Sequence, residues 1–114
     1  MIKIYHNARC KKSREGLELL NESGRDFEVK EYLKEPVTEE ELADLLLKLG
    51  MAPIELVRKE EKTWKENYKG KDLSDKELVR VMAENPKLIQ RPIVVKGNSA
   101  VIGRPAEKIK DLIG

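Results

Sequence analysis

The chain has 114 residues, the length of one ordinary domain. Its 23 Lys and Arg residues nearly balance its 21 Asp and Glu residues, so the formal net charge is only +2. This charge is too small to indicate a nucleic-acid partner or an anionic membrane surface, and no apolar run reaches the ~20 residues of a membrane span. Because the start of the chain lacks the apolar region of a signal peptide, we expect a cytoplasmic protein that binds neither nucleic acid nor membrane.

The first third of the chain predicts a strand, a helix and a second strand. Residues 2–5 are expected to form the first strand, and residues 13–21 form a helix that stops near Gly24. Alternating side chains predict a second strand over residues 26–33, which Pro36 then interrupts.

Residues 38–88 predict a run of helices. Capping boxes at 38–41 and 74–77 each begin a helix, and shorter helical pieces are expected at 53–57 and 62–68. The helix after the first box carries apolar residues at the i, i+3, i+4, i+7 spacing of one face, namely Leu42, Leu45, Leu46 and Leu49.

The last part of the chain predicts a hairpin and a helix. Residues 92–95 and 100–102 are β-branched or apolar and are separated by a turn at 97–99. A final helix is expected to begin near Pro105, with inward-facing side chains at Ile109, Leu112 and Ile113.

The element order predicts an α/β fold. A βαβ unit requires a parallel pair of strands, whereas the closing hairpin is antiparallel, so the four-stranded sheet is mixed and flanked by helices. This is the thioredoxin pattern with a helical insertion, at about 38–88, between the two halves of a single domain spanning residues 1–114.

Cys10 lies where the first strand gives way to the first helix. The helix dipole and the four nearby basic residues favour the nucleophilic thiolate and would also attract an oxyanion (Arg9, Lys11, Lys12 and Arg14). The alternative is a small buried hydrophobic residue, but the polar and basic neighbours favour a functional thiol. As the only cysteine it has no intramolecular disulfide partner, and with one histidine in the chain no structural zinc site is expected.

Several other residues are candidates for supporting roles. His6 is either a hydrogen-bonded structural group or a group that tunes the thiolate, and Asn7 can bond within the loop. Ser13 can cap the helix or donate to the thiolate. Pro92 stands at a strand entrance in the usual trans form or shapes a loop beside the thiol as a cis proline.

Three arginines are candidates for binding an oxyanion, because the guanidinium group presents a planar fork of donors. Arg58 ends a short apolar helix, while Arg91 and Arg104 flank the predicted hairpin. Taken singly, each can equally be a solvated surface charge, and their spacing does not show that they converge.

Four segments in register give the chain a specific resemblance over nearly its whole length: residues 4–10 with Ser13 and Arg14, 56–59, 88–95 and 103–105. The chain resembles the ArsC family of thioredoxin-like arsenate reductases, which use glutathione and glutaredoxin. The resemblance implies that Cys10 is the nucleophile and that arsenate is bound by Arg58, Arg91 and Arg104.

The same resemblance implies supporting roles and a reaction. His6 would influence the cysteine, Ser13 and Arg14 would start the helix, and Pro92 would be cis. Arsenate would be reduced to arsenite through an adduct on Cys10, with glutathione as co-substrate, glutaredoxin as the resolving partner and no bound cofactor.

Two alternatives to an arsenate reductase stay open. Spx-type regulators, which bind a partner without turnover, share the outline of the fold but carry a Cys-x-x-Cys switch. Here the second position of that motif is Ser13, and Arg104 supplies an arginine that those regulators lack, so the enzyme is favoured. The other alternative is a glutathione-dependent thiol reductase with another substrate, because Lys11 and Lys12 stand where the compared reductases have small residues.

Overall fold

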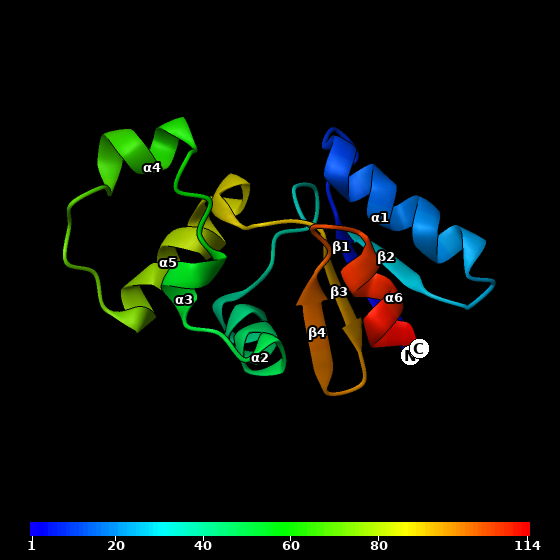
Figure 1. The fold of residues 1–114 in the computed structure, drawn as a ribbon. Coiled ribbons are helices and arrows are strands. Elements are labelled where there is room, and N and C mark those ends of the chain that lie inside the picture. The colour runs from blue at the N-terminus through cyan, green and yellow to red at the C-terminus, as the bar shows by residue number, and fades with distance from the viewer. The chain divides into compact units, whose positions relative to one another are not determined.

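A computed structural model describes all residues from 1 to 114 and divides the chain into two compact units (Figure 1). Unit 1 joins the two ends of the chain, Met1–Glu35 and Arg91–Gly114, and unit 2 is the intervening segment Pro36–Gln90. No helix in either unit is both long enough and apolar enough to cross a bilayer.

Unit 1 contains the whole β-sheet. Its strand order is β2-β1-β3-β4, in which β1 pairs with β2 in parallel and with β3 in antiparallel orientation, and β3 pairs with β4 in antiparallel orientation. The predicted mixed four-stranded sheet is therefore confirmed. The elements of this unit are β1 (Ile2–His6), α1 (Lys11–Glu22), β2 (Glu28–Glu31), β3 (Ile93–Lys96), β4 (Ser99–Ile102) and α6 (Glu107–Ile113).

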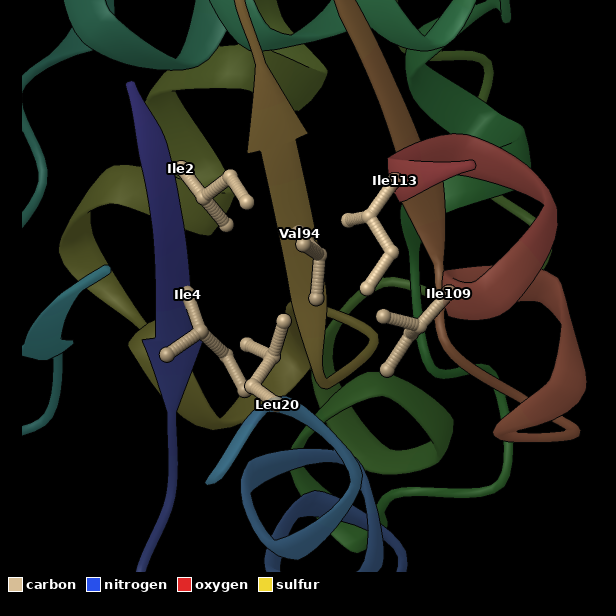
Figure 2. Packing of buried hydrophobic residues seen from close by; sticks show 6 residues of the cluster. All are labelled: Ile2, Ile4, Leu20, Val94, Ile109 and Ile113. Atoms are coloured by element: carbon tan, nitrogen blue, oxygen red, sulfur yellow. The ribbon is translucent and has the colours of Figure 1, made fainter. Parts of the chain in front are cut away.

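Alternate residues of the central strands form the core of unit 1. Ile2 and Ile4 project from one face of β1, and Ile4 lies opposite Val94 of β3. Figure 2 shows Leu20 of α1 and two isoleucines of α6 converging on these side chains, so both helices cover the same face of the sheet. Each such buried aliphatic side chain contributes about 1.5–3 kcal/mol.

Two boundaries in unit 1 differ from those predicted, those of α1 and β2, whereas α6 begins near Pro105 as predicted. Helix α1 begins at Lys11 rather than at residue 13, which makes Cys10 its N-cap. Strand β2 is only four residues long, because the carbonyl of Glu31 accepts the backbone N–H groups of Lys34 and Glu35, each at 2.9 Å, and so turns the chain. Helix α6 begins at Glu107, two residues after Pro105.

Unit 2 is helical, and its capping residues explain where its longer helices begin and end. Ser74 Oγ accepts the N–H of Glu77 at 3.2 Å and Glu77 Oε1 accepts the N–H of Ser74 at 3.1 Å, which confirms the predicted capping box. Gly50 ends the preceding helix in the left-handed region at φ 67°, where glycine is favoured. The elements are α2 (Glu39–Leu49), α3 (Pro53–Leu56), α4 (Lys62–Asn67), α5 (Asp75–Glu84) and a 3₁₀ turn, η1 (Pro86–Leu88).

Two short extended segments of unit 2 pair with each other. Val57 and Ile89 form an antiparallel bridge. On either side of it, the N–H of Arg58 donates to the carbonyl of Leu88 at 2.7 Å and the N–H of Gln90 donates to the carbonyl of Leu56 at 3.0 Å. These bonds fix the backbone of Arg58 within the unit.

Candidate active site

Cys10 is the residue from which helix α1 starts. Its backbone is extended (φ −96°, ψ 123°), its N–H donates to the carbonyl of Asn7 at 3.0 Å, and its carbonyl accepts the N–H of Arg14 at 3.0 Å. The thiol is partly exposed and is not in a disulfide. It therefore sits among the unpaired N–H groups of a helix N-terminus while solvent can still reach it.

Ser13 joins the end of strand β1 to the first turn of α1. The residue is fully buried, and its hydroxyl oxygen accepts the backbone N–H of Asn7 at 2.9 Å. The same oxygen lies 2.7 Å from Nδ1 of His6. Two short hydrogen bonds to one buried hydroxyl hold the loop between His6 and Cys10 in a fixed conformation.

Side chains of the loop and helix complete this local network. Oδ1 of Asn7 accepts the backbone N–H of Arg9 at 3.0 Å, and Nη1 of Arg14 donates to the carbonyl of Ala8 at 2.9 Å. Asn7 and Arg14 thus satisfy backbone groups that the tight loop leaves without a secondary-structure partner.

The buried surroundings of His6 favour the neutral form of its imidazole. Burial of the ring lowers the pKa of His6 below its ordinary value, and the carboxylate of Glu31, its neighbour across β1 and β2, only partly opposes this effect. In the tautomer that carries its proton on Nε2, the ring accepts a hydrogen bond from the Ser13 hydroxyl.

The thiol of Cys10 is more acidic than an ordinary cysteine. Partial burial by itself raises the pKa of Cys10, but the backbone N–H groups of Ser13 and Lys12 and the guanidinium of Arg91 together outweigh burial, and the net pKa is lowered. Each of these groups stabilises the thiolate, which is the reactive form.

Arg91 reaches the thiol from a distant part of the sequence, immediately before strand β3. Its Nε and Nη1 atoms are buried and have no hydrogen-bond partner. The guanidinium of Arg91 acts on the Cys10 thiol both as a charge and as a hydrogen-bond donor, so its donors and the thiol lie at one place. The Arg91–Pro92 peptide bond is cis, the form that the family resemblance implied.

The other two arginines have surroundings of their own. Arg104 is half-buried in unit 1, between β4 and α6, and its backbone N–H donates to the carbonyl of Ile102 at 2.9 Å. Arg58 belongs to unit 2, where its guanidinium donates to the carbonyl of Lys87 at 3.2 Å. Its charge is partly balanced by Glu60 at 3.6 Å and Glu61 at 3.5 Å.

Residues 5–112 match the model of the ArsC family. The chain belongs to the ArsC family. It is 40% identical to the arsenate reductase of Neisseria meningitidis serogroup B over 98% of this chain and 97% of that protein. It is 48% identical to the uncharacterized protein YfgD of Escherichia coli, over 99% of this chain and 97% of that one.

A solved structure agrees with this assignment. The arsenate reductase of Vibrio cholerae superposes on this ArsC-family chain with a TM-score of 0.91 at 43% identity, covering 96% of this chain and 95% of the other. The predicted thioredoxin-like architecture is thereby confirmed.

One expectation about the electrostatics of this ArsC-family site needs correction. The basic residues next to Cys10 in the sequence are exposed, and Lys12 pairs with Glu15 at 3.7 Å. Among charged side chains, the leading influence on the thiol is instead Arg91. Exposed charges are screened by water, whereas a guanidinium with buried nitrogens acts at close range.

Sequence reasoning missed two glycines of the ArsC-family site. A Cβ on Gly16 would lie 2.9 Å from Cγ of Pro92, and a Cβ on Gly103 would lie 3.1 Å from the same atom. Both glycines let Pro92 pack closely against its surroundings. A glycine inside the predicted helix 13–21 was the one available signal, because glycine is unfavourable there without a packing reason.

The lowered pKa predicts how the thiol responds to pH. Because alkylation requires the thiolate, its rate plotted against pH should show an inflection below the ~8.5 of a free thiol. Arg91→Leu removes a charge that stabilises the thiolate, so the inflection should move upward. Arg25→Leu, which removes an exposed charge from the same unit, should leave it unchanged. An unshifted inflection in Arg91→Leu would show that Arg91 does not act on the thiol.

Proposed function

We propose that this ArsC-family protein reduces arsenate to arsenite, with Cys10 as the nucleophile. The observation that carries the proposal is a thiol of lowered pKa beside Arg91, whose Nε and Nη1 are buried without partners. A nucleophile and buried guanidinium donors at one place suit attack on an oxyanion. Arsenate reductases that are 40% and 43% identical over nearly the whole chain support the same activity.

The oxyanion is bound by arginine. Arg91 supplies guanidinium donors at the thiol, and Arg58 and Arg104 join it in the proposed site on the strength of the family resemblance. A guanidinium group neutralises charge on arsenate and directs two donors at its oxygens, which favours attack by a thiolate that would otherwise be repelled.

The first chemical step forms a sulfur–arsenic bond. The Cys10 thiolate attacks arsenic(V), and one arsenate oxygen leaves as water after it takes up protons. Glutathione thiolate then attacks the sulfur of Cys10, and the electron pair of the sulfur–arsenic bond remains on arsenic. Arsenic is thereby reduced to arsenic(III) and leaves as arsenite, while Cys10 and glutathione form a mixed disulfide.

The second stage restores the enzyme and needs an external thiol, because the chain has one cysteine. A glutaredoxin thiolate attacks the glutathione sulfur of the mixed disulfide and releases Cys10 as the thiolate. Two thiols supply the two electrons, so the mechanism uses glutathione as a co-substrate and requires no bound cofactor. Dependence on a reduced glutathione pool places the protein in the cytoplasm in this proposal.

The supporting residues act on the nucleophile through the loop. Ser13 presents its backbone N–H to the thiolate and bonds His6 and Asn7 through its hydroxyl. Asn7 and Arg14 hold the loop backbone, and Pro92 shapes the approach of Arg91. We therefore assign these five residues positioning roles.

The test combines purified protein with arsenate, glutathione, glutaredoxin, glutathione reductase and NADPH. Arsenite, measured by chromatography with arsenic-specific detection, should appear together with NADPH oxidation, and omission of glutaredoxin should stop turnover. Absence of arsenite above the enzyme-free control, with folded protein, would refute the proposal. NADPH oxidation with a glutathione mixed disulfide but not with arsenate would instead indicate a thiol reductase of another specificity.

A further inference from the structure

Unit 2 carries an open apolar groove of about 580 Å³. One wall is a face of α2, and the others come from the start of α3 and the first turns of α5. Six apolar residues line it: Ala43, Leu46, Leu47, Met51, Pro53 and Val79. All of the lining residues belong to unit 2.

Leu47 is the most unusual residue of the groove. Its two predecessors in α2, Leu45 and Leu46, are 2% and 6% exposed, whereas Leu47 is 82% exposed. The core of the unit therefore does not use this side chain. A single exposed leucine is ordinary, but this one adjoins the apolar groove and extends its apolar surface.

The rim of the groove is acidic. Glu39, Glu40 and Asp75 lie along it, and Lys76 is the only basic residue among the lining residues. These carboxylates stand in the first turns of α2 and α5, where acidic residues also complement the helix dipole. The same carboxylates give the edge of the groove a negative charge, although the formal net charge of the whole chain is +2.

The charge of the rim discriminates among possible occupants. An anionic membrane or a nucleic acid would be repelled. A symmetric dimer formed through the groove would bring together two rims that each carry three carboxylates and one lysine, so like charges would outnumber opposite pairs across the interface. A segment that carries both apolar and basic side chains can pack against the apolar residues of the groove and pair with the carboxylates at its edge.

We propose that the groove binds a short amphipathic helix of a partner protein, with apolar side chains packed on Leu47 and Met51 and with Lys or Arg side chains opposite Glu40 and Asp75. This mode is the helix-in-groove recognition used by many small domains. Burial of Leu47 supplies the apolar contribution, and the carboxylates select the basic partner.

The experiment uses a designed probe, a labelled 14-residue peptide with leucine at i, i+3, i+4 and i+7 and lysine at the flanking positions. Its counterpart has glutamate in place of every lysine. Fluorescence anisotropy measures affinity, and amide chemical shifts of ¹⁵N-labelled protein locate the site. The lysine peptide should bind and shift the amides of Ala43, Leu47 and Val79, its affinity should fall as salt is raised, and the glutamate peptide should not bind.

Matched variants separate the two contributions. Leu47→Ser should weaken peptide binding about tenfold, and Val29→Ser, at a 46% exposed residue outside the groove, should not. The double variant Glu40→Gln with Asp75→Asn should weaken binding and flatten its salt dependence. Asp44→Asn with Glu84→Gln removes the same number of carboxylates from the same two helices, outside the groove, and should have no effect.

Several results would overturn the proposal. These are equal binding of the two peptides, shifts confined to residues outside the groove, and no loss of affinity in Leu47→Ser. Concentration-dependent shifts of the groove amides without peptide would show that a second copy is the occupant, and binding of anionic vesicles through the groove would show a lipid surface. Both of these results contradict a basic partner helix.

Discussion

Cys10→Ser should abolish the proposed arsenate reduction, and we expect a loss of at least about a thousandfold, down to the rate without enzyme. A serine hydroxyl stays protonated at neutral pH, does not bond arsenic as a thiolate does and cannot form a mixed disulfide. The steady-state assay gives the loss of rate. Mass spectrometry of protein incubated with arsenate and glutathione should show a glutathione adduct on the wild type and none on the variant.

A relocated thiol tests whether position as well as chemistry matters. In the double variant Cys10→Ser with Ala8→Cys, the thiol lies in the same loop, two residues before the N-cap of α1. It would not receive the N–H groups of Ser13 and Lys12 that stabilise the thiolate at Cys10, so activity should stay near background. Recovery of substantial activity by this variant would refute the claim that the helix N-terminus activates the nucleophile.

Gly16→Ala should destabilise the protein, although alanine is the better helix former. The new Cβ would lie 2.9 Å from Cγ of Pro92 and 3.1 Å from Cδ1 of Ile109. The side chain of Ile109 can rotate away from the new methyl group, but the proline ring is rigid. Either the helix or the Arg91–Pro92 segment must therefore shift. Overpacking costs about 1–3 kcal/mol, more than the roughly 1 kcal/mol gained in helix propensity. We expect the free energy of unfolding, measured in urea, to fall by up to about 2 kcal/mol.

A control in the same helix separates packing from propensity. Asn21 is exposed on α1, and Asn21→Ala should leave stability unchanged or slightly higher. Movement of Pro92 would also move Arg91, so alkylation of Cys10 in Gly16→Ala should have its inflection at a higher pH than in the wild type. Stability equal to that of Asn21→Ala would show that the close approach to Pro92 is not sterically limiting.

The elements that local sequence determines were predicted well. Capping residues such as Ser74 and Thr38 act on N–H groups three residues away, and the apolar spacing of Leu42, Leu45 and Leu46 defines one buried helical face. The mixed sheet followed from a parallel βαβ unit and an antiparallel hairpin. All these signals lie within a few residues of the structure that they specify.

Predicted boundaries were wrong where a backbone hydrogen bond outside the regular helix and strand patterns ends an element. The carbonyl of Glu31 accepts two N–H groups and ends strand β2 earlier than the alternation of residues 26–33 predicts. These bonds have no recognisable pattern in the sequence.

The candidate site likewise has a part that could be predicted from the sequence and a part that could not. The residues from His6 to Arg14 are close in sequence, and their grouping around Cys10 was predictable from the strand-to-helix boundary. The influence of Arg91 was not predictable from spacing, because 80 intervening residues separate it from the thiol. Only the family resemblance connected the two, and the packing of Gly16 against Pro92 is visible only in three dimensions.

The long separation between Cys10 and Arg91 has a consequence for the life of the chain. Arg91 lies two residues before strand β3, and this strand pairs with β1 only once the sheet has assembled. A newly made or unfolded chain therefore holds a cysteine of ordinary reactivity, and the thiol becomes acidic as the two ends of the sequence come together. Folding thus raises the fraction of Cys10 that is thiolate at neutral pH and, at the same time, limits its access to solvent.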